Sequence, residues 1–117
     1  MGRLTTHVLD TSAGRTAAGV RIELFRTGDQ KLRLAEAISN DDGRVESPLL
    51  EGDEFCAGEY ELVFHAGDYF ARSEPVSHSK QRFLDQVVIR FGVDDASEHY
   101  HVPLLLSPFA YSTYRGS

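Results

Sequence analysis

The chain has 117 residues, a formal net charge of −6 and a single cysteine. This length suits one domain, residues 1–117, with its own hydrophobic core. The acidic balance argues against a nucleic-acid partner, and the lone Cys56 excludes an internal disulfide and a cysteine-based zinc site. No apolar run is long enough to span a membrane, and the N-terminus lacks the apolar segment of a signal peptide, so we expect a cytoplasmic protein.

Short strands are predicted along most of the chain, because apolar residues recur at every second position. The predicted strands cover residues 4–10, 20–25, 32–40, 45–50, 60–64, 86–91 and 99–106, and a last one runs from the Ser107–Ala110 corner to the end of the chain. Turn-forming residues separate them at 11–19, 27–30, 40–44 and 93–98. A single short helix is predicted over 65–74, ended by Pro75, and a polar loop over 77–82. About eight short strands with regular turns predict an all-β, two-sheet sandwich, since so short a helix cannot cover a sheet.

Two histidines fall on strand faces that the core does not need. In the first strand His7 lies opposite an apolar set that includes Leu4 and Val8. In the strand over 99–106, His101 lies opposite an equally apolar set that includes Leu104. Solvated histidines on an outer sheet face explain this pattern as well as catalysis does. The remaining histidines are expected at a strand end, in a loop and at a strand start: His65, His78 and His99.

Two other kinds of site are possible by residue type. A zinc ion could be held by His7, His99 and His101, although a His-x-His spacing on a strand is also common by chance. A Ser-His-Asp triad is possible by composition, but the chain contains no Gly-x-Ser-x-Gly elbow. Neither alternative is favoured over a site without metal.

Several motifs are similar to those of one family. They are Thr6–Asp10 followed by Gly14-Arg15, Asp42-Gly43-Arg44, the Tyr100–Leu105 run Tyr-His-x-Pro-Leu-Leu, and the closing Tyr114-Arg115-Gly116-Ser117. With these motifs the chain resembles the 5-hydroxyisourate hydrolases, the transthyretin-like enzymes of urate breakdown. One departure is Thr16, where relatives carry proline, and it affects a turn rather than a catalytic position.

The resemblance implies both a fold and an activity. It implies a transthyretin-like sandwich that forms a homotetramer, with active sites in a channel between dimers, and no cofactor. It implies hydrolysis of 5-hydroxyisourate to 2-oxo-4-hydroxy-4-carboxy-5-ureidoimidazoline. The residues that match the active-site positions of the family are His7, Arg44 and His101 as catalytic groups, and Tyr114, Arg115, Gly116 and Ser117 as substrate-binding groups.

These residue types suit the opening of a cyclic amide. Two imidazoles can share acid and base work near neutral pH, and the guanidinium of Arg44 can stabilise negative charge on a carbonyl oxygen. The alternatives are a small-molecule carrier of the transthyretin type, or an interaction module without chemistry, because a fold alone does not decide function.

Overall fold

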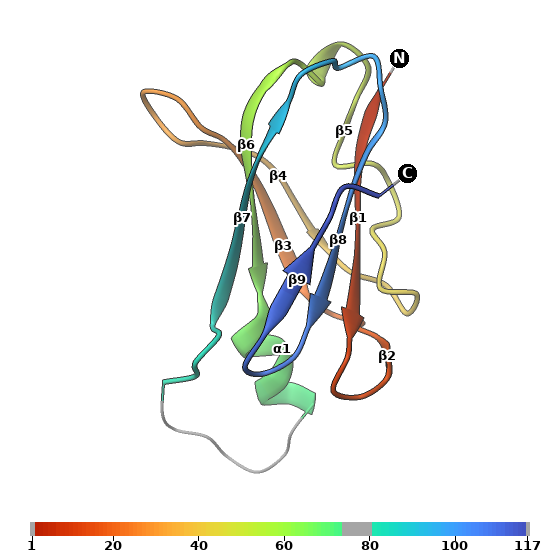
Figure 1. Ribbon diagram of the computed structural model, residues 1–117, viewed down its shortest axis with the longest axis vertical. Coiled ribbons are helices and arrows are strands. Elements are labelled where there is room, and N and C mark those ends of the chain that lie inside the picture. The colour runs from red at the N-terminus through yellow and green to blue at the C-terminus, as the bar shows by residue number, and fades with distance from the viewer. Residues whose placement is uncertain (1, 74–80, 117) are drawn as a thin grey trace.

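The computed structural model describes residues 2–73 and 81–116, and in them two β-sheets pack face to face (Figure 1). The elements in chain order are β1 (Arg3–Asp10), β2 (Arg15–Thr16), β3 (Arg21–Arg26), β4 (Leu32–Ile38), β5 (Leu50–Glu51), the single-turn 3-10 helix η1 (Gly52–Glu54), β6 (Gly58–His65), α1 (Ala66–Ser73), β7 (Gln86–Val93), β8 (Tyr100–Leu106) and β9 (Tyr111–Thr113). The predicted all-β sandwich with one short α-helix is confirmed.

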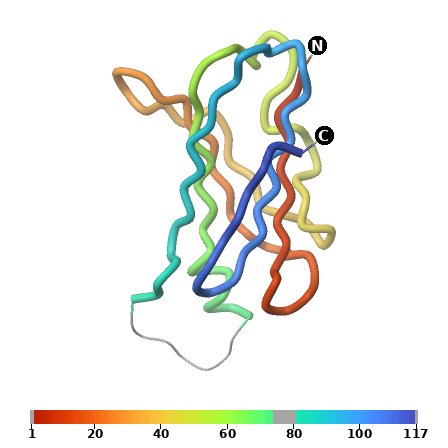
Figure 2. Tube along the Cα trace, in the orientation of Figure 1, coloured from red at the N-terminus to blue at the C-terminus, as the bar shows by residue number. Residues whose placement is uncertain are grey.

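The first sheet has the order β2-β1-β8-β9, with β5 paired to the start of β1. The second has the order β4-β3-β6-β7. All pairs are antiparallel except β1 with β8, whose parallel register sets His7 opposite Pro103 and Thr5 opposite His101. The first and last described segments therefore lie at the same end of the molecule (Figure 2). This parallel pair builds the site described below.

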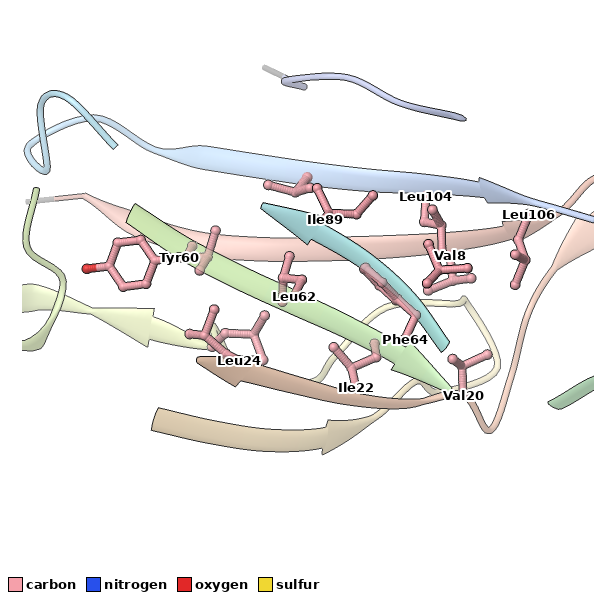
Figure 3. Close-up of a cluster of buried hydrophobic side chains, with 14 of the residues drawn as sticks. Val8, Val20, Ile22, Leu24, Tyr60, Leu62, Phe64, Ile89, Leu104 and Leu106 are labelled. Atoms are coloured by element: carbon pink, nitrogen blue, oxygen red, sulfur yellow. The ribbon is translucent and has the colours of Figure 1, made fainter. Parts of the chain in front are cut away.

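The core lies between the sheets and is formed by the apolar half of each alternating strand (Figure 3). Side chains of the first sheet and of the second meet there fully buried: Leu4, Val8, Leu104 and Leu106 on one side, and Ile22, Leu24, Tyr60, Leu62 and Phe64 on the other. Burial of each such side chain stabilises the fold by about 1.5–3 kcal/mol. The core faces predicted for the first strand and for 99–106 are confirmed, although β8 begins one residue later, at Tyr100.

The outer faces of the two sheets differ in character. The second sheet carries ion pairs across its strands, such as Lys31 to Glu61 at 2.9 Å and Glu61 to Arg90 at 2.7 Å. His65 ends β6 as predicted, but it is buried and lies 2.7 Å from the Glu23 carboxylate. The first sheet instead presents imidazoles and apolar side chains on its outer face. The functional site is therefore expected on the first sheet.

The predicted strand over 45–50 is wrong for most of its length, because only Leu50 lies in a strand, β5. Pro48 has no N–H to give to a ladder, and the backbone joins β1 through Leu49, whose N–H donates to the Leu4 carbonyl at 2.8 Å. Conversely, part of the predicted 11–19 turn forms a short strand, β2, which pairs with the end of β1. The buried Asp10 carboxylate holds this turn by accepting hydrogen bonds from Ser12 and Ala13.

The last predicted strand is interrupted rather than continuous. β9 ends at Thr113, and pairing with β8 resumes only where the Gly116 N–H donates to the His101 carbonyl at 2.7 Å. The gap falls opposite Pro103, which has no N–H to donate, and the Thr113 hydroxyl donates to the Pro103 carbonyl instead.

The predicted helix is confirmed as α1, one residue inside its predicted start. Its predicted end at Pro75, the loop residue His78 and most of the polar loop over 77–82 lie outside the described residues. Among the residues that the structure describes, no helix is both long and apolar enough to cross a membrane.

Candidate active site

The parallel pairing of β1 and β8 brings the two strand-face histidines together. Both side chains project from the outer face of the first sheet, and their ring centroids lie 6.3 Å apart. The two residues are far apart in the sequence, so the contact exists only because the first strand and β8 are neighbours in the sheet. Each imidazole is partly buried.

Arg44 reaches the same face from the turn that follows β4. Asn40 organises this turn, because its side-chain carbonyl accepts hydrogen bonds from the backbone N–H groups of Asp42 and Arg44. The turn docks on β1 where the Val8 N–H donates to the Gly43 carbonyl at 2.8 Å, and Arg44 forms an isolated bridge with His7. The sequence-predicted trio of His7, Arg44 and His101 is therefore brought to one place.

Gly43 makes this docking possible. Its φ of +74° is a conformation that suits glycine, and a Cβ at this position would stand 2.4 Å from the Val8 carbonyl oxygen. The Asp-Gly-Arg run thus serves to bring the Arg44 backbone against the strand that carries His7.

Burial and the Arg44 charge lower the pKa of His7 below the ordinary 6.5, whereas a hydrogen bond to the Asp42 backbone and the Asp42 charge raise it. The Nε2 atom of His7 is buried, and among the described residues it has no hydrogen-bond partner. A buried polar atom without a partner costs about 1–3 kcal/mol. Such an atom on an outer face is typical of a site that a ligand completes.

His101 is held along two edges of its ring. The Thr5 hydroxyl oxygen lies 2.8 Å from its Nδ1 atom, and the Gly116 backbone lies against its Cδ2 atom. Burial lowers the pKa of His101 below 6.5, and the charge of Arg44 and the proximity of His7 lower it further. Both histidines are therefore neutral at neutral pH, which is the form that can accept or pass on a proton.

The other residues of the closing tetrapeptide are placed differently. Tyr114 is exposed. The Arg115 guanidinium turns away from the two imidazoles: it lies 3.9 Å from the centre of the Tyr100 ring and donates hydrogen bonds to the Glu98 carboxylate and the His99 carbonyl, both at 3.0 Å. In this chain Arg115 holds the terminal segment in place. Ser117 lies outside the described residues.

The geometry of the described residues gives no support to the zinc alternative. Within residues 2–73 and 81–116, no three His, Cys, Asp or Glu side chains gather as metal ligands would, and His99 is exposed. Cys56 is a free, exposed thiol in the loop before β6. A hollow of about 440 Å³ beside α1, lined by residues that include Arg15, Tyr69 and Arg72, shares no residue with the histidine site.

Sequence reasoning missed two groups that contact the histidines, the Thr5 hydroxyl and the Asp42 backbone. Thr5 does share the outer-face alternation of His7, and this signal could have marked it as a neighbour. Its contact with His101 depends on the register of β1 against β8, however, and no local pattern encodes that register.

A family model described as HIUase/Transthyretin family matches residues 4–116. The chain belongs to this family. It is 59% identical over 117 residues to 5-hydroxyisourate hydrolase 2 of Rhizobium meliloti (strain 1021), covering 99% of this chain and 97% of that protein. The resemblance predicted from the sequence motifs is thus confirmed.

Solved structures give the same relationship. The 5-hydroxyisourate hydrolase of Klebsiella pneumoniae is 34% identical and superposes with a TM-score of 0.82 over the full length of both chains. An (S)-allantoin synthase is 49% identical, with a TM-score of 0.91 over 99% of this chain. This chain spans only 44% of that longer protein.

Proposed function

We propose that this protein hydrolyses 5-hydroxyisourate, opening a cyclic amide to give 2-oxo-4-hydroxy-4-carboxy-5-ureidoimidazoline. The observation that carries the proposal is the meeting of His7, Arg44 and His101 on one sheet face, in a chain that is 59% identical over nearly its whole length to a protein named for this activity. Neither imidazole is needed to build the sandwich, since both lie outside its core.

The reaction adds water across one C–N bond. The water oxygen forms a bond to the ring carbonyl carbon, the C–N bond breaks, and the leaving nitrogen gains a proton. One of His7 and His101 accepts the proton that the water loses and, as the imidazolium formed in this way, gives a proton to the leaving nitrogen. The other orients the substrate by hydrogen bonding. Two neutral imidazoles whose ring centroids are 6.3 Å apart can contact the same small heterocycle from two sides.

Arg44 supplies the positive charge of the site. Its guanidinium binds carbonyl oxygens of the substrate and stabilises the negative charge that develops on the attacked carbonyl. Its influence on the pKa of both imidazoles reflects a position close to each. Tyr114, Arg115, Gly116 and Ser117 complete the substrate-binding set in this proposal, with Arg115 acting through the position of the terminal segment.

The same face supports assembly as a homotetramer with its sites in a channel between dimers. The outer face of the first sheet combines the histidines with apolar side chains, among them Leu9 and Leu105, and an apolar surface of this kind is typical of an interface. β7 and β9 are edge strands, and an edge strand offers unpaired backbone groups to a second copy. A second copy would enclose the site and reduce its contact with water.

Transport of a small molecule, the alternative function, is not favoured. A carrier has no use for two neutral imidazoles with a guanidinium beside them, and the near full-length match at 59% identity bears the name of a hydrolase. The cytoplasmic location and the single domain over 1–117 stay predictions, which cell fractionation and limited proteolysis would test.

The decisive experiment is incubation of the purified protein with freshly generated 5-hydroxyisourate, with the absorbance decay compared with the spontaneous reaction. We expect rapid decay with the native chain and a strongly reduced but still measurable acceleration with Arg44→Ala. Arg44→Lys is the matched variant, because it keeps the charge but loses the planar pair of donors, and it should fall between them. A native chain that leaves the spontaneous rate unchanged would refute the proposed function.

A further inference from the structure

The Thr5 hydroxyl is the one side-chain group of the described residues that hydrogen-bonds the His101 ring, at 2.8 Å from Nδ1. We propose that Thr5 is a positioning residue that holds His101 with its proton on Nε2. His101 then offers its Nε2–H to the substrate as a hydrogen-bond donor, and His7 is the base that takes the proton from water and returns it to the leaving nitrogen. The assignment of roles rests on the proposed function, but the position of the proton does not.

The contact is fixed by the backbone rather than by chance side-chain placement. Thr5 and His101 are direct partners in the parallel register of β1 and β8, so their side chains stand next to each other on the outer face. Both are half-buried. A β-branched side chain on a strand also has few rotamers, so the Thr5 hydroxyl is restricted to a position next to Nδ1 of His101.

The direction of the hydrogen bond follows from counting donors and acceptors. A threonine hydroxyl has one hydrogen to donate. Within residues 2–73 and 81–116 the Thr5 hydroxyl has no hydrogen-bond partner other than His101. If the hydroxyl donates to Nδ1, its hydrogen is used, and the neutral ring carries its own proton on Nε2. If Nδ1 donated instead, the half-buried hydroxyl hydrogen would have no acceptor among the described residues, which is the costlier arrangement.

Among residues 2–73 and 81–116, no group other than Thr5 hydrogen-bonds Nδ1 of His101. Gly116 packs against the Cδ2 edge and contributes only backbone there. The ionisable groups that act on the ring are Arg44, from the turn after β4, and His7, from β1, and both disfavour a second proton on it. The ring is therefore neutral, and its Nε2–H is the group it can offer to a substrate.

His7 shows the complementary arrangement. Its Nε2 has no hydrogen-bond partner among the described residues. Burial and the Arg44 charge lower the pKa of the ring, whereas the neighbouring Asp42 raises it. One imidazole can thus take the proton from water and return it to the leaving nitrogen, while the other donates a hydrogen bond to the substrate.

The proton position can be measured directly by NMR on the native protein labelled with ¹⁵N-histidine, with His101→Asn used to assign the signal. We expect the neutral His101 ring to show an unprotonated Nδ1 and a protonated Nε2. In Thr5→Val, which keeps the shape of the side chain but not the hydroxyl, the two tautomers should mix. A native His101 with its proton on Nδ1 would overturn the inference, whatever the activity of the protein.

Turnover supplies a second test. Thr5→Val should lower kcat by about tenfold or more, as expected for a lost hydrogen bond that matters in the transition state, and Thr5→Ser should restore it to within about threefold. The matched control is Thr6→Val, the next residue on β1, whose hydroxyl donates to the Val102 carbonyl on the core side. It should leave kcat unchanged even if it lowers the melting temperature.

Two failures can be told apart. If the native chain does not accelerate 5-hydroxyisourate decay, the proposed function fails while the NMR result still decides the tautomer. If the native chain is active and Thr5→Val retains full kcat with an unchanged pH profile, Thr5 has no positioning role and the inference is wrong.

Discussion

Gly116 lies so close to the imidazole of His101 that a Cβ at this position would stand 2.7 Å from the ring atom Cδ2. Its N–H donates to the His101 carbonyl at 2.7 Å. Glycine is therefore required at position 116, because the backbone there passes too close to the His101 ring to leave room for a Cβ. The terminal segment and the candidate catalytic histidine form one unit.

Gly116→Ala should displace the His101 ring and lower turnover by about tenfold or more, because small shifts of a catalytic group are costly. The melting temperature should change little, since the segment is at the edge of the sheet. Gly92→Ala on β7 is the control, because a Cβ there would meet no atom within 4 Å. Equal effects of the two substitutions on kcat would contradict this view of Gly116.

Removal of either imidazole should abolish most turnover. His7→Ala and His101→Ala are each expected to lower kcat by about 10²–10⁴-fold, the usual contribution of a general acid or base. The protein should stay folded, since neither ring is part of the core. His99→Ala is the matched control, because His99 is exposed and offers only its backbone carbonyl to Arg115. Near-native turnover in both variants would exclude the roles assigned to them.

The acid limit of activity should lie below pH 6.5. Burial and the Arg44 charge lower the pKa of His7 and His101 from that value, so both rings stay neutral until the pH falls further. The profile of kcat/KM should therefore be flat around neutrality and fall only in mildly acidic solution. In Arg44→Ala the residual activity should begin to fall at a higher pH than in the native protein. The reason is that the Arg44 charge, one cause of the lowered pKa values of His7 and His101, is removed.

The same shifts predict how stability depends on pH. As the pH falls through 6.5, the unfolded chain takes up protons at these histidines before the folded chain does. The free energy of unfolding therefore decreases as the pH drops below 6.5. The decrease ends once the pH lies below the lowered pKa values that His7 and His101 have in the folded protein. Thermal melts across this range should show a shallower loss for the double variant with glutamine at both positions; an identical slope would mean that the shifts are absent.

Deletion of residues 115–117 should lower activity far more than stability. The deletion removes two contacts. One is the contact of Gly116 with His101, and the other is the contact of the Arg115 guanidinium with the Tyr100 ring. The second loss is a surface contact worth about 0.5–1 kcal/mol, whereas the first frees a candidate catalytic ring. Paired measurements of kcat and melting temperature on the full and shortened chains decide this, and unchanged kcat would remove the terminal segment from the mechanism.

Assembly should be visible in solution as a species of four times the 13.0 kDa chain mass. Leu105→Glu places a charge on the outer face of the first sheet and should dissociate the tetramer between its dimers. Leu32→Glu is the control, because Leu32 is 61% exposed on β4, in the other sheet. Sedimentation of the native protein as a monomer at micromolar concentration would refute the tetramer and its channel.

The strands and the core faces were predictable because they depend on a local pattern. Alternation alone placed Leu4 and Val8 inside and His7 outside, as the structure has them. The error over 45–50 has a local cause too, since Pro48 interrupts what otherwise resembles a strand. The gap after Thr113 is different: it depends on Pro103 lying opposite, and that is a property of strand pairing.

The candidate site was predictable in its members but not in its contacts. Motif resemblance named His7, Arg44 and His101, whereas the partners that set their protonation, Thr5 and the Asp42 backbone, were not predicted. Nor was the direction of Arg115, whose guanidinium covers Tyr100. These are relations between segments distant in the sequence, and one sequence carries no direct record of them.

The parallel pairing of β1 with β8 also has a consequence for how the protein acquires activity during folding. The hydrogen bond between Thr5 and His101 joins residues 96 positions apart, nearly the full length of the chain. Contacts of such long range close large loops and form slowly. A chain emerging from the ribosome can form the β3–β4 hairpin early, whereas the histidine pair must wait for β8 to be released and docked. Catalytic competence should therefore appear in the last kinetic phase of refolding, after most of the second sheet is already protected from hydrogen exchange.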